Sequence, residues 1–230
     1  YQLQAEIEHE FQMSGANGPA YTSIVGGGAN GCILHYIENK DMLKNGDLVL
    51  IDAGCEFEDY ASDITRTFPV NGKFSDEQAA IYDIVLKALK EAIDVTQAGT
   101  PYNKTNETTI RVITEGLVEL GLLKGDINDL IKAEAHREFY MHGAGHWLGL
   151  DVHDVGDYKI DGEWRIYEPG MVVTIEPGIY ISPKNKKVDT KWRGIGVRIE
   201  DDIVITKTGN INLTSKVPKE RNEIEKMMAK

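Results

Sequence analysis

Residues 45–57 read NGDLVLIDAGCEF, and residues 169–181 read PGMVVTIEPGIYI. The two segments align without a gap, and their glycines and β-branched residues coincide. Asp52 then falls on Glu176, so that each copy places a carboxylic acid after an apolar run and two residues before a glycine. The alignment predicts one structural unit that is used twice, with the acid as part of the repeat.

A second acid follows in each copy, Asp63 in YASDITRTF and Glu200 in GVRIEDDIVI. If the first pair of strands forms a hairpin that turns around Phe57 and Glu58, Asp52 and Asp63 lie opposite each other. Like charges in that position repel and destabilise the strand pair. One acid before a glycine is usually a turn residue, but four acids at matched positions predict a site that holds a cation.

The predicted cation is a metal ion, because no basic residue follows the same repeat. Arg66 and Arg198 lie close to the second acids in sequence and can neutralise part of their charge. Oxygen ligands favour hard ions such as Mn²⁺ or Mg²⁺, and an added imidazole moves the preference towards Mn²⁺, Fe²⁺, Co²⁺ or Zn²⁺. A histidine close to the acids is therefore informative.

Three of the six histidines fall within residues 142–156, HGAGHWLGLDVHDVG. His142 and His146 are four residues apart, which places them on one face of a helix or a strand, and the glycines favour a strand or a loop. The spacing is similar to that of the zinc motif H-E-x-x-H, but Gly143 stands where that motif has its glutamate. A lone histidine is usually structural, whereas three beside a repeated set of acids indicate a functional site.

Carboxylates from four strands together with an imidazole are a natural ligand set for two metal ions. Two ions about 3.5–4 Å apart generate hydroxide near neutral pH and stabilise the oxyanion of a tetrahedral intermediate. The pattern therefore predicts the hydrolysis of an amide or an ester.

The composition excludes several kinds of partner. The 230 residues carry a formal net charge of −12, with a pI near 5.0, so that neither nucleic acid nor an anionic membrane is an expected partner. No apolar run reaches the roughly 18–20 residues that cross a bilayer, and no signal segment is recognisable. The two cysteines show no metal-ligand spacing and no disulfide framework, which favours free thiols and a cytoplasmic location.

Helical and hairpin patterns are mixed along the chain, which predicts an α+β fold. A long helix is expected over residues 75–99, where Ser75 and Gln78 form a capping box. Other helices are expected at the N-terminus, over residues 105–120 and after Pro218. The first helix has no capping residue before it, from which we expect the chain to be a fragment of a longer protein.

The order D…D…H…E…E on a duplicated α+β domain resembles the pita-bread family of metallopeptidases. The segments with the most specific resemblance, to the bacterial aminopeptidase P branch, are residues 54–75, 140–156 and 193–206. The resemblance implies one catalytic domain over residues 1–230, with halves of roughly residues 1–100 and 101–230. It also implies a preceding N-terminal domain that this chain lacks, and a homo-oligomer is possible in the full-length protein.

The resemblance implies two divalent metal ions per chain, with manganese as the family metal. Asp52 would chelate one ion, and Asp63 and Glu200 would bridge the two. His146 and Glu176 would complete the second site.

The resemblance also implies the residues that act on the substrate. Glu176 would relay a proton to the leaving amine, a role that suits a carboxylate near the nucleophile. His153 would face the scissile carbonyl, and His142 and His35 would line the substrate side. Arg198 would lie near the C-terminal part of the substrate, with Tyr180 on the wall.

The activity that the resemblance implies is removal of the N-terminal residue of a peptide that has proline at its second position. One alternative is a prolidase, which cuts only Xaa-Pro dipeptides with the same metals. A second alternative is a pita-bread binding module without catalysis, which intact ligand positions argue against.

Overall fold

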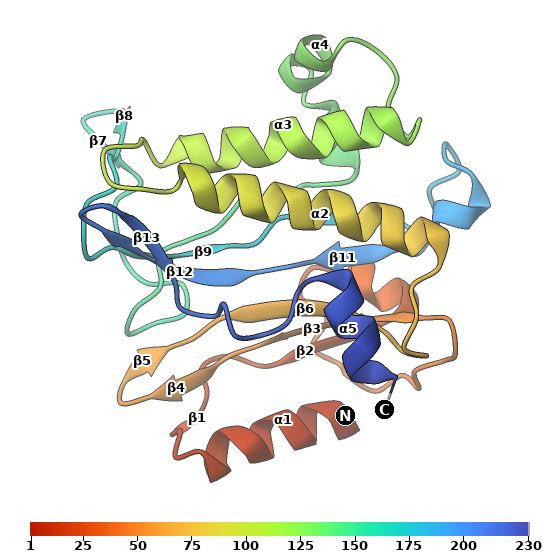
Figure 1. Cartoon of the computed structure of the whole chain (residues 1–230), viewed down its shortest axis with the longest axis horizontal. Coiled ribbons are helices and arrows are strands. Elements are labelled where there is room, and N and C mark those ends of the chain that lie inside the picture. The colour runs from red at the N-terminus through yellow and green to blue at the C-terminus, as the bar shows by residue number, and fades with distance from the viewer. Residues whose placement is uncertain (230) are drawn as a thin grey trace.

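Two long helices, α2 (Asp76–Val95) and α3 (Asn103–Glu119), lie side by side over a layer of antiparallel strands (Figure 1). The computed structural model describes residues 1–229 of the chain. Helix α2 begins where the sequence predicts, because the Ser75 hydroxyl accepts from the Gln78 amide and the Gln78 side chain accepts from the Ser75 amide. Its apolar face is buried in the main core, which confirms the predicted helix.

The strands form two groups that correspond to the two copies of the repeat. The first group has the order β2 (Ile24–Gly27), β3 (Leu48–Ala53), β6 (Ile64–Pro69). The second group contains β13 (Gly209–Asn212), β12 (Asp201–Thr206) and β9 (Val172–Ile175), with β10 (Gly178–Tyr180) paired to β11 (Gly196–Arg198). All of these pairs are antiparallel, and the predicted α+β fold class is confirmed.

The first hairpin differs from the predicted register. Strands β4 (Cys55–Phe57) and β5 (Tyr60–Ala61) are joined by Glu58 and Asp59, which both have left-handed backbone, with φ of 49° and 63°. Such a two-residue turn matches the twist of a hairpin. It lies one residue beyond the predicted turn, so Asp52 pairs with Thr65 across the ladder and not with Asp63. The predicted Asp52–Asp63 cross-strand pair is therefore wrong.

The second half does place its two acids opposite each other. Ile175 pairs with Asp201, and Gly178 pairs with Arg198. Counting inward along both strands from these pairs brings Glu176 opposite Glu200. Because Asp52 corresponds to Glu176, the register counterpart of Glu200 in the first half is Thr65.

The two halves meet along β6 and the run from β11 to β12, which lie side by side in Figure 1. The Glu200 amide donates to the Thr65 carbonyl at 3.0 Å, and the Thr67 hydroxyl donates to the Arg198 carbonyl at 3.0 Å. Residues that carry the candidate site thus come from both sides of one seam.

The remaining elements are short or peripheral. Helix α1 (Gln2–Met13) lies on the opposite side of the strands from α2 and α3 and has no fully buried residue (Figure 1). The C-terminal helix α5 (Arg221–Met228), which the sequence predicts after Pro218, buries Ile224. The other elements are β1 (Gly18–Pro19), α4 (Ile127–Lys132), β7 (Lys159–Ile160), β8 (Glu163–Trp164) and the 3₁₀ turns η1 (Gly28–Cys32), η2 (Ala135–Glu138) and η3 (Thr190–Trp192).

The helices within residues 1–229 are all too short or too polar to cross a membrane. Cys32 and Cys55 are free thiols, as expected, and the Cys32 thiol donates to the Ile181 carbonyl.

Candidate metal centre

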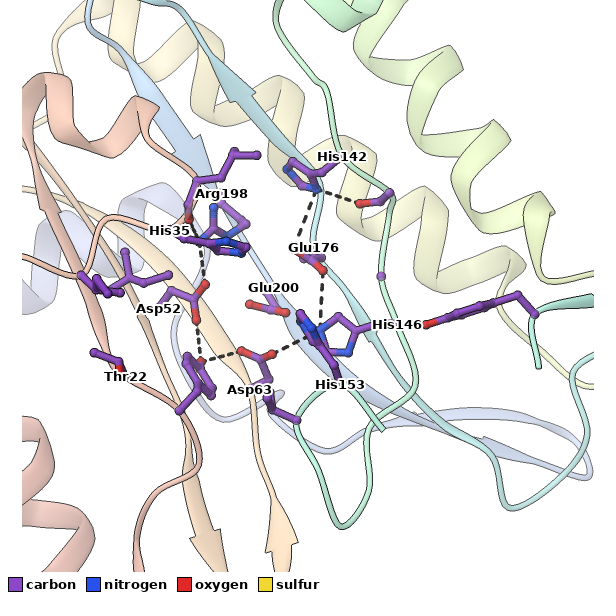
Figure 2. Close-up of a pocket in the computed structure, with 18 residues that line it drawn as sticks. Thr22, His35, Asp52, Asp63, His142, His146, His153, Glu176, Arg198 and Glu200 are labelled. Carbon is purple, nitrogen blue, oxygen red and sulfur yellow. Dashed lines mark hydrogen bonds and ion pairs between the residues drawn. The ribbon is translucent and has the colours of Figure 1, made fainter. Parts of the chain in front are cut away.

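The side chains predicted to bind metal converge on one cleft of about 560 Å³ (Figure 2). The predicted ligands that line it are Asp52, Asp63, His146, Glu176 and Glu200. The predicted substrate-side residues that line it are His35, His142, His153 and Arg198. Acids from the β3–β6 pair point across the cleft towards those carried by the second half (Figure 2).

Three of these side chains are close enough to share one ion. Each of Asp63, His146 and Glu200 offers one ligand atom, and the three atoms lie within 4.8 Å of one another. His146 Nε2 lies 3.4 Å from Asp63 Oδ2 and 3.8 Å from Glu176 Oε1. His146 Nδ1 lies 2.9 Å from the Trp147 carbonyl, which can only accept, so Nδ1 carries a proton. Burial lowers the pKa of the ring, but Asp63 and Glu176 outweigh it and raise the pKa. Nε2 faces carboxylate oxygens, where a bound metal ion would take the place of the proton on this nitrogen.

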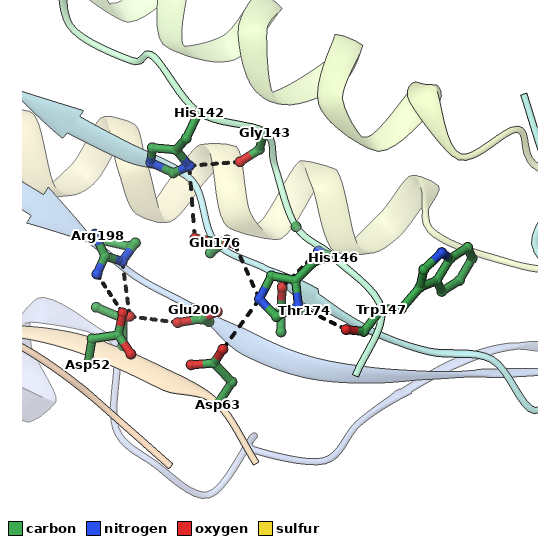
Figure 3. Close-up of polar contacts among 12 residues, drawn as sticks. Asp52, Asp63, His142, Gly143, His146, Trp147, Thr174, Glu176, Arg198 and Glu200 are labelled. Atoms are coloured by element: carbon green, nitrogen blue, oxygen red, sulfur yellow. Dashed lines mark hydrogen bonds and ion pairs between the residues drawn. The ribbon is translucent and has the colours of Figure 1, made fainter. Parts of the chain in front are cut away.

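Close approach of two backbone segments positions His146. The segment that holds the HGAGH motif runs beside β9, with the Thr174 amide donating to the His146 carbonyl at 2.9 Å (Figure 3). A Cβ at Gly145 would lie 1.9 Å from the Thr174 carbonyl oxygen. The close approach of this segment to β9 therefore requires glycine at position 145. A Cβ at Gly143, in contrast, would lie no nearer than 4.0 Å to its neighbours.

Burial and mutual repulsion act on the acids in the cleft. Burial, together with the charges of Asp63 and Glu176, raises the pKa of Glu200 well above its usual value. Burial raises the pKa of Glu176 to about 7, although the charges of Arg198 and His146 oppose the change. Burial also raises the pKa of Asp63, against the hydrogen bond from His146. Divalent cations would relieve this repulsion, so the donor set fits the metal ions that the sequence predicts.

Arg198 is the one Lys or Arg among the described residues that line this cleft. Its guanidinium donates from Nη2 to Asp52 Oδ2 at 2.5 Å and from Nη1 to the Tyr180 hydroxyl at 2.9 Å. Tyr180 is only 2% exposed, so it supports Arg198 and His142 from behind and does not form the wall itself.

Two histidines on the substrate side, His142 and His153, have lowered pKa values, which favours their neutral form. His142 Nδ1 lies 2.8 Å from the Gly143 carbonyl, and Nε2 lies 2.8 Å from the Tyr180 hydroxyl. Burial and the nearby Arg198 charge lower the pKa of His142 to about 4. The ring of His153 contacts that of His146 edge-on, with 4.1 Å between ring centroids. Burial and, to a smaller extent, the charge of His146 lower the pKa of His153.

The structure adds Tyr21, which the sequence does not reveal. Its hydroxyl lies 2.5 Å from both Asp52 Oδ1 and Asp63 Oδ1. A hydroxyl has one proton and can satisfy only one of these two acceptors. Tyr21 precedes β2 in a segment without a recognisable motif, so only the tertiary structure places it at the acids.

Two further residues behind the acids were also missed. The Thr65 hydroxyl donates to Glu200 Oε2 at 2.6 Å, and Asp202 Oδ2 accepts from the Asp63 amide at 3.1 Å. Asp202 is buried, and burial raises its pKa to about 8. Both residues contact ligands that come from the other half of the repeat.

A cleft in which carboxylates gather around the imidazole of His146, on a duplicated scaffold, defines a metal-dependent hydrolase. Residues 1–207 match the model of metallopeptidase family M24. The chain therefore belongs to metallopeptidase family M24.

The chain is also similar in sequence to individual aminopeptidases. The chain is 58% identical over 228 residues to an Xaa-Pro aminopeptidase of Escherichia coli (strain K12). The alignment covers 99% of this chain and 51% of that relative. The chain is 41% identical over 225 residues to human Xaa-Pro aminopeptidase 3, in an alignment that covers 98% of this chain and 44% of that relative. The chain thus spans about half the length of the curated relatives it matches.

Solved structures agree with this assignment. Pseudomonas aeruginosa aminopeptidase PepP superposes with a TM-score of 0.99 and 61% sequence identity, covering 100% of this chain and 52% of the other. Yersinia pestis proline aminopeptidase P II superposes with a TM-score of 0.96 and 60% identity, again covering 100% and 52%. The pita-bread fold expected from the sequence is therefore confirmed.

Proposed function

We propose that this chain is the catalytic domain of an Xaa-Pro aminopeptidase, which removes the N-terminal residue of peptides that have proline at the second position. The observation that carries the proposal is the convergence of all five predicted ligands on one cleft within a metallopeptidase family fold. The relatives named Xaa-Pro aminopeptidase, at up to 58% identity over this chain, support the substrate class.

The proposed centre holds two divalent ions. Asp52 would hold one ion, Asp63 and Glu200 would contribute oxygens to both, and His146 and Glu176 would complete the second site. A set rich in carboxylate oxygens with a single imidazole favours Mn²⁺ over softer or thiolate-bound metals. When bound, such ions supply Lewis acidity and activate water near neutral pH.

The side chains around the centre divide the remaining tasks. Glu176, with a pKa of about 7, is suited to take up a proton and to pass it to the leaving amine. His153 faces the scissile carbonyl across the cleft. His35 and His142 line the substrate side. Arg198 binds the C-terminal part of the peptide, and the Tyr180 hydroxyl holds the Arg198 guanidinium in place.

A peptide bond that precedes proline requires this kind of catalyst. The bond is a tertiary amide without an N–H group, so a peptidase cannot grip that hydrogen. Activation of the carbonyl by metal ions does not depend on it. The net charge of −12 favours a substrate with a free cationic amine and disfavours nucleic acid and anionic membranes as partners. We place the enzyme in the cytoplasm, where its full-length form can assemble as a homo-oligomer.

The direct test is cleavage of Xaa-Pro-Xaa tripeptides by the Mn²⁺-loaded protein. The Asp63→Asn variant should lose activity by at least about a hundredfold, because it removes a bridging ligand. Asp59→Asn is the matched control, since it makes the same chemical change on the same hairpin outside the cleft. Equal turnover by wild type and Asp63→Asn would contradict the assignment.

Substrate length separates the proposal from its alternatives. Faster cleavage of Xaa-Pro dipeptides than of tripeptides would identify a prolidase. Absence of metal binding after careful loading would identify a binding module. The same assays on a chain extended to the full length of its relatives test whether the other half of those proteins is needed for turnover.

A further inference from the structure

Thr65 is a buried residue at the seam between the two halves, and it contacts the proposed centre without being a ligand. Its side chain is 0% exposed. Thr65 pairs with Asp52 across the first hairpin. In the second half, the strand register places Glu200 opposite Glu176 in the same way. The repeat therefore places a hydroxyl in one half at the position where the other half has an acid.

The hydroxyl has a fixed direction. Arg198 Nε lies 3.1 Å from Thr65 Oγ1, and a guanidinium can only donate. Thr65 Oγ1 lies 2.6 Å from Glu200 Oε2, and Glu200 has to be ionised to bind a metal ion, in which state its carboxylate can only accept. The single proton of the hydroxyl is therefore directed to Glu200, which leaves the other lone pairs of that carboxylate free for other partners.

The same guanidinium also binds an acid of the first half. Arg198 Nη2 donates to Asp52 Oδ2 at 2.5 Å, so the contacts run from Asp52 through Arg198 and Thr65 to Glu200. This path joins two of the proposed ligands, one from each half, by directional hydrogen bonds between buried groups. Rotation of Glu200 or withdrawal of Arg198 would break it.

We propose that Thr65 is a positioning residue of the metal centre. Its hydroxyl orients the Glu200 carboxylate towards the ions and keeps Arg198 on Asp52. The inference rests on the proposed metal centre, and it goes beyond the ligand set by assigning the orientation of one ligand to a residue that touches no metal.

Thr67 provides a control within the same strand. It is also 0% exposed, and it lies two residues further along β6, on the same face. Its hydroxyl donates to the Arg198 carbonyl at 3.0 Å and accepts from the Arg198 amide at 3.2 Å. Thr67 therefore supports the seam through backbone contacts alone, and its loss should affect stability without reorienting a ligand.

The test compares Thr65→Val, Thr65→Ala and Thr65→Ser with Thr67→Val. Each metal-free variant is titrated with Mn²⁺ by calorimetry, the bound Mn²⁺ pair is examined by electron paramagnetic resonance, and unfolding is measured in urea. Thr65→Val and Thr65→Ala should bind Mn²⁺ at least tenfold more weakly and alter the resonance of the pair. Thr65→Ser, which keeps the hydroxyl, should stay within about threefold of wild type.

Thr67→Val should lose stability but keep wild-type Mn²⁺ affinity. Wild-type affinity in Thr65→Ala, or an equal loss in Thr65→Ser and Thr67→Val, would overturn the proposal. A wild-type protein that binds no Mn²⁺ would overturn it together with the metal centre. If wild type binds Mn²⁺ but cleaves no Xaa-Pro peptide, only the proposed function fails, because every readout for Thr65 is independent of turnover.

Discussion

The guanidinium of Arg198 lies 2.5 Å from the carboxylate of Asp52, and the two side chains are only 4% and 11% exposed. The pair joins β3 of the first half to β11 of the second. It neutralises one acid of a crowded set, while Asp63, Glu176 and Glu200 have raised pKa values because they are buried close together. The remaining charge is what divalent ions would compensate.

Removal of this cation should destabilise the metal-free protein. Arg198→Met leaves Asp52 buried without its partner, which typically costs about 3–5 kcal/mol. The free energy of unfolding in urea should fall by that amount, and the double variant Asp52→Asn/Arg198→Met should recover part of the loss. Unchanged stability in Arg198→Met would show that Asp52 does not depend on this ion pair.

Gly145 should tolerate no side chain, because its Cβ would overlap the Thr174 carbonyl at 1.9 Å. Gly145→Ala must push the His146 segment away from β9, which should cost about 3 kcal/mol or more and weaken Mn²⁺ binding. Gly143→Ala is the matched control in the same motif, since its Cβ meets nothing closer than 4.0 Å. Similar Mn²⁺ affinities for the two variants would argue against this packing.

Stability of the metal-free protein should depend on pH through Glu176. Its pKa rises from the ordinary 4.5 to about 7 on folding, so the folded protein binds a proton that the unfolded chain has lost. This contribution to stability is complete below about pH 4.5 and disappears as the pH rises through 7.

Compared with Glu176→Gln, wild type should therefore lose on the order of 2–3 kcal/mol between pH 4.5 and 7.5. Urea unfolding at a series of pH values measures the difference, and exposed Glu163→Gln serves as the control. Added Mn²⁺ should stabilise wild type more at pH 7.5 than at pH 5, because protons compete for its ligands. Parallel pH curves for wild type and Glu176→Gln would contradict the raised pKa.

Local signals made the fold and the acids of the cleft predictable. The capping box at Ser75 and the apolar period of the following helix depend only on neighbouring residues. The repeat around Asp52 and Glu176 pointed to the acids because both copies keep the same spacing from a glycine.

Features that depend on tertiary structure or unusual backbone were not predictable. The hairpin turn uses Glu58 and Asp59 with positive φ, a conformation that favours glycine. No residue type at these positions therefore indicates a turn one residue further along. Tyr21 and Thr65 reach the site only because the two halves pack together.

Location of bound Mn²⁺ by anomalous diffraction from crystals grown with the metal tests the central claim most directly. We expect two peaks per chain, about 3.5–4 Å apart, among the side chains of Asp52, Asp63, His146, Glu176 and Glu200. A single peak, or peaks outside this cleft, would contradict a dinuclear centre built from these residues.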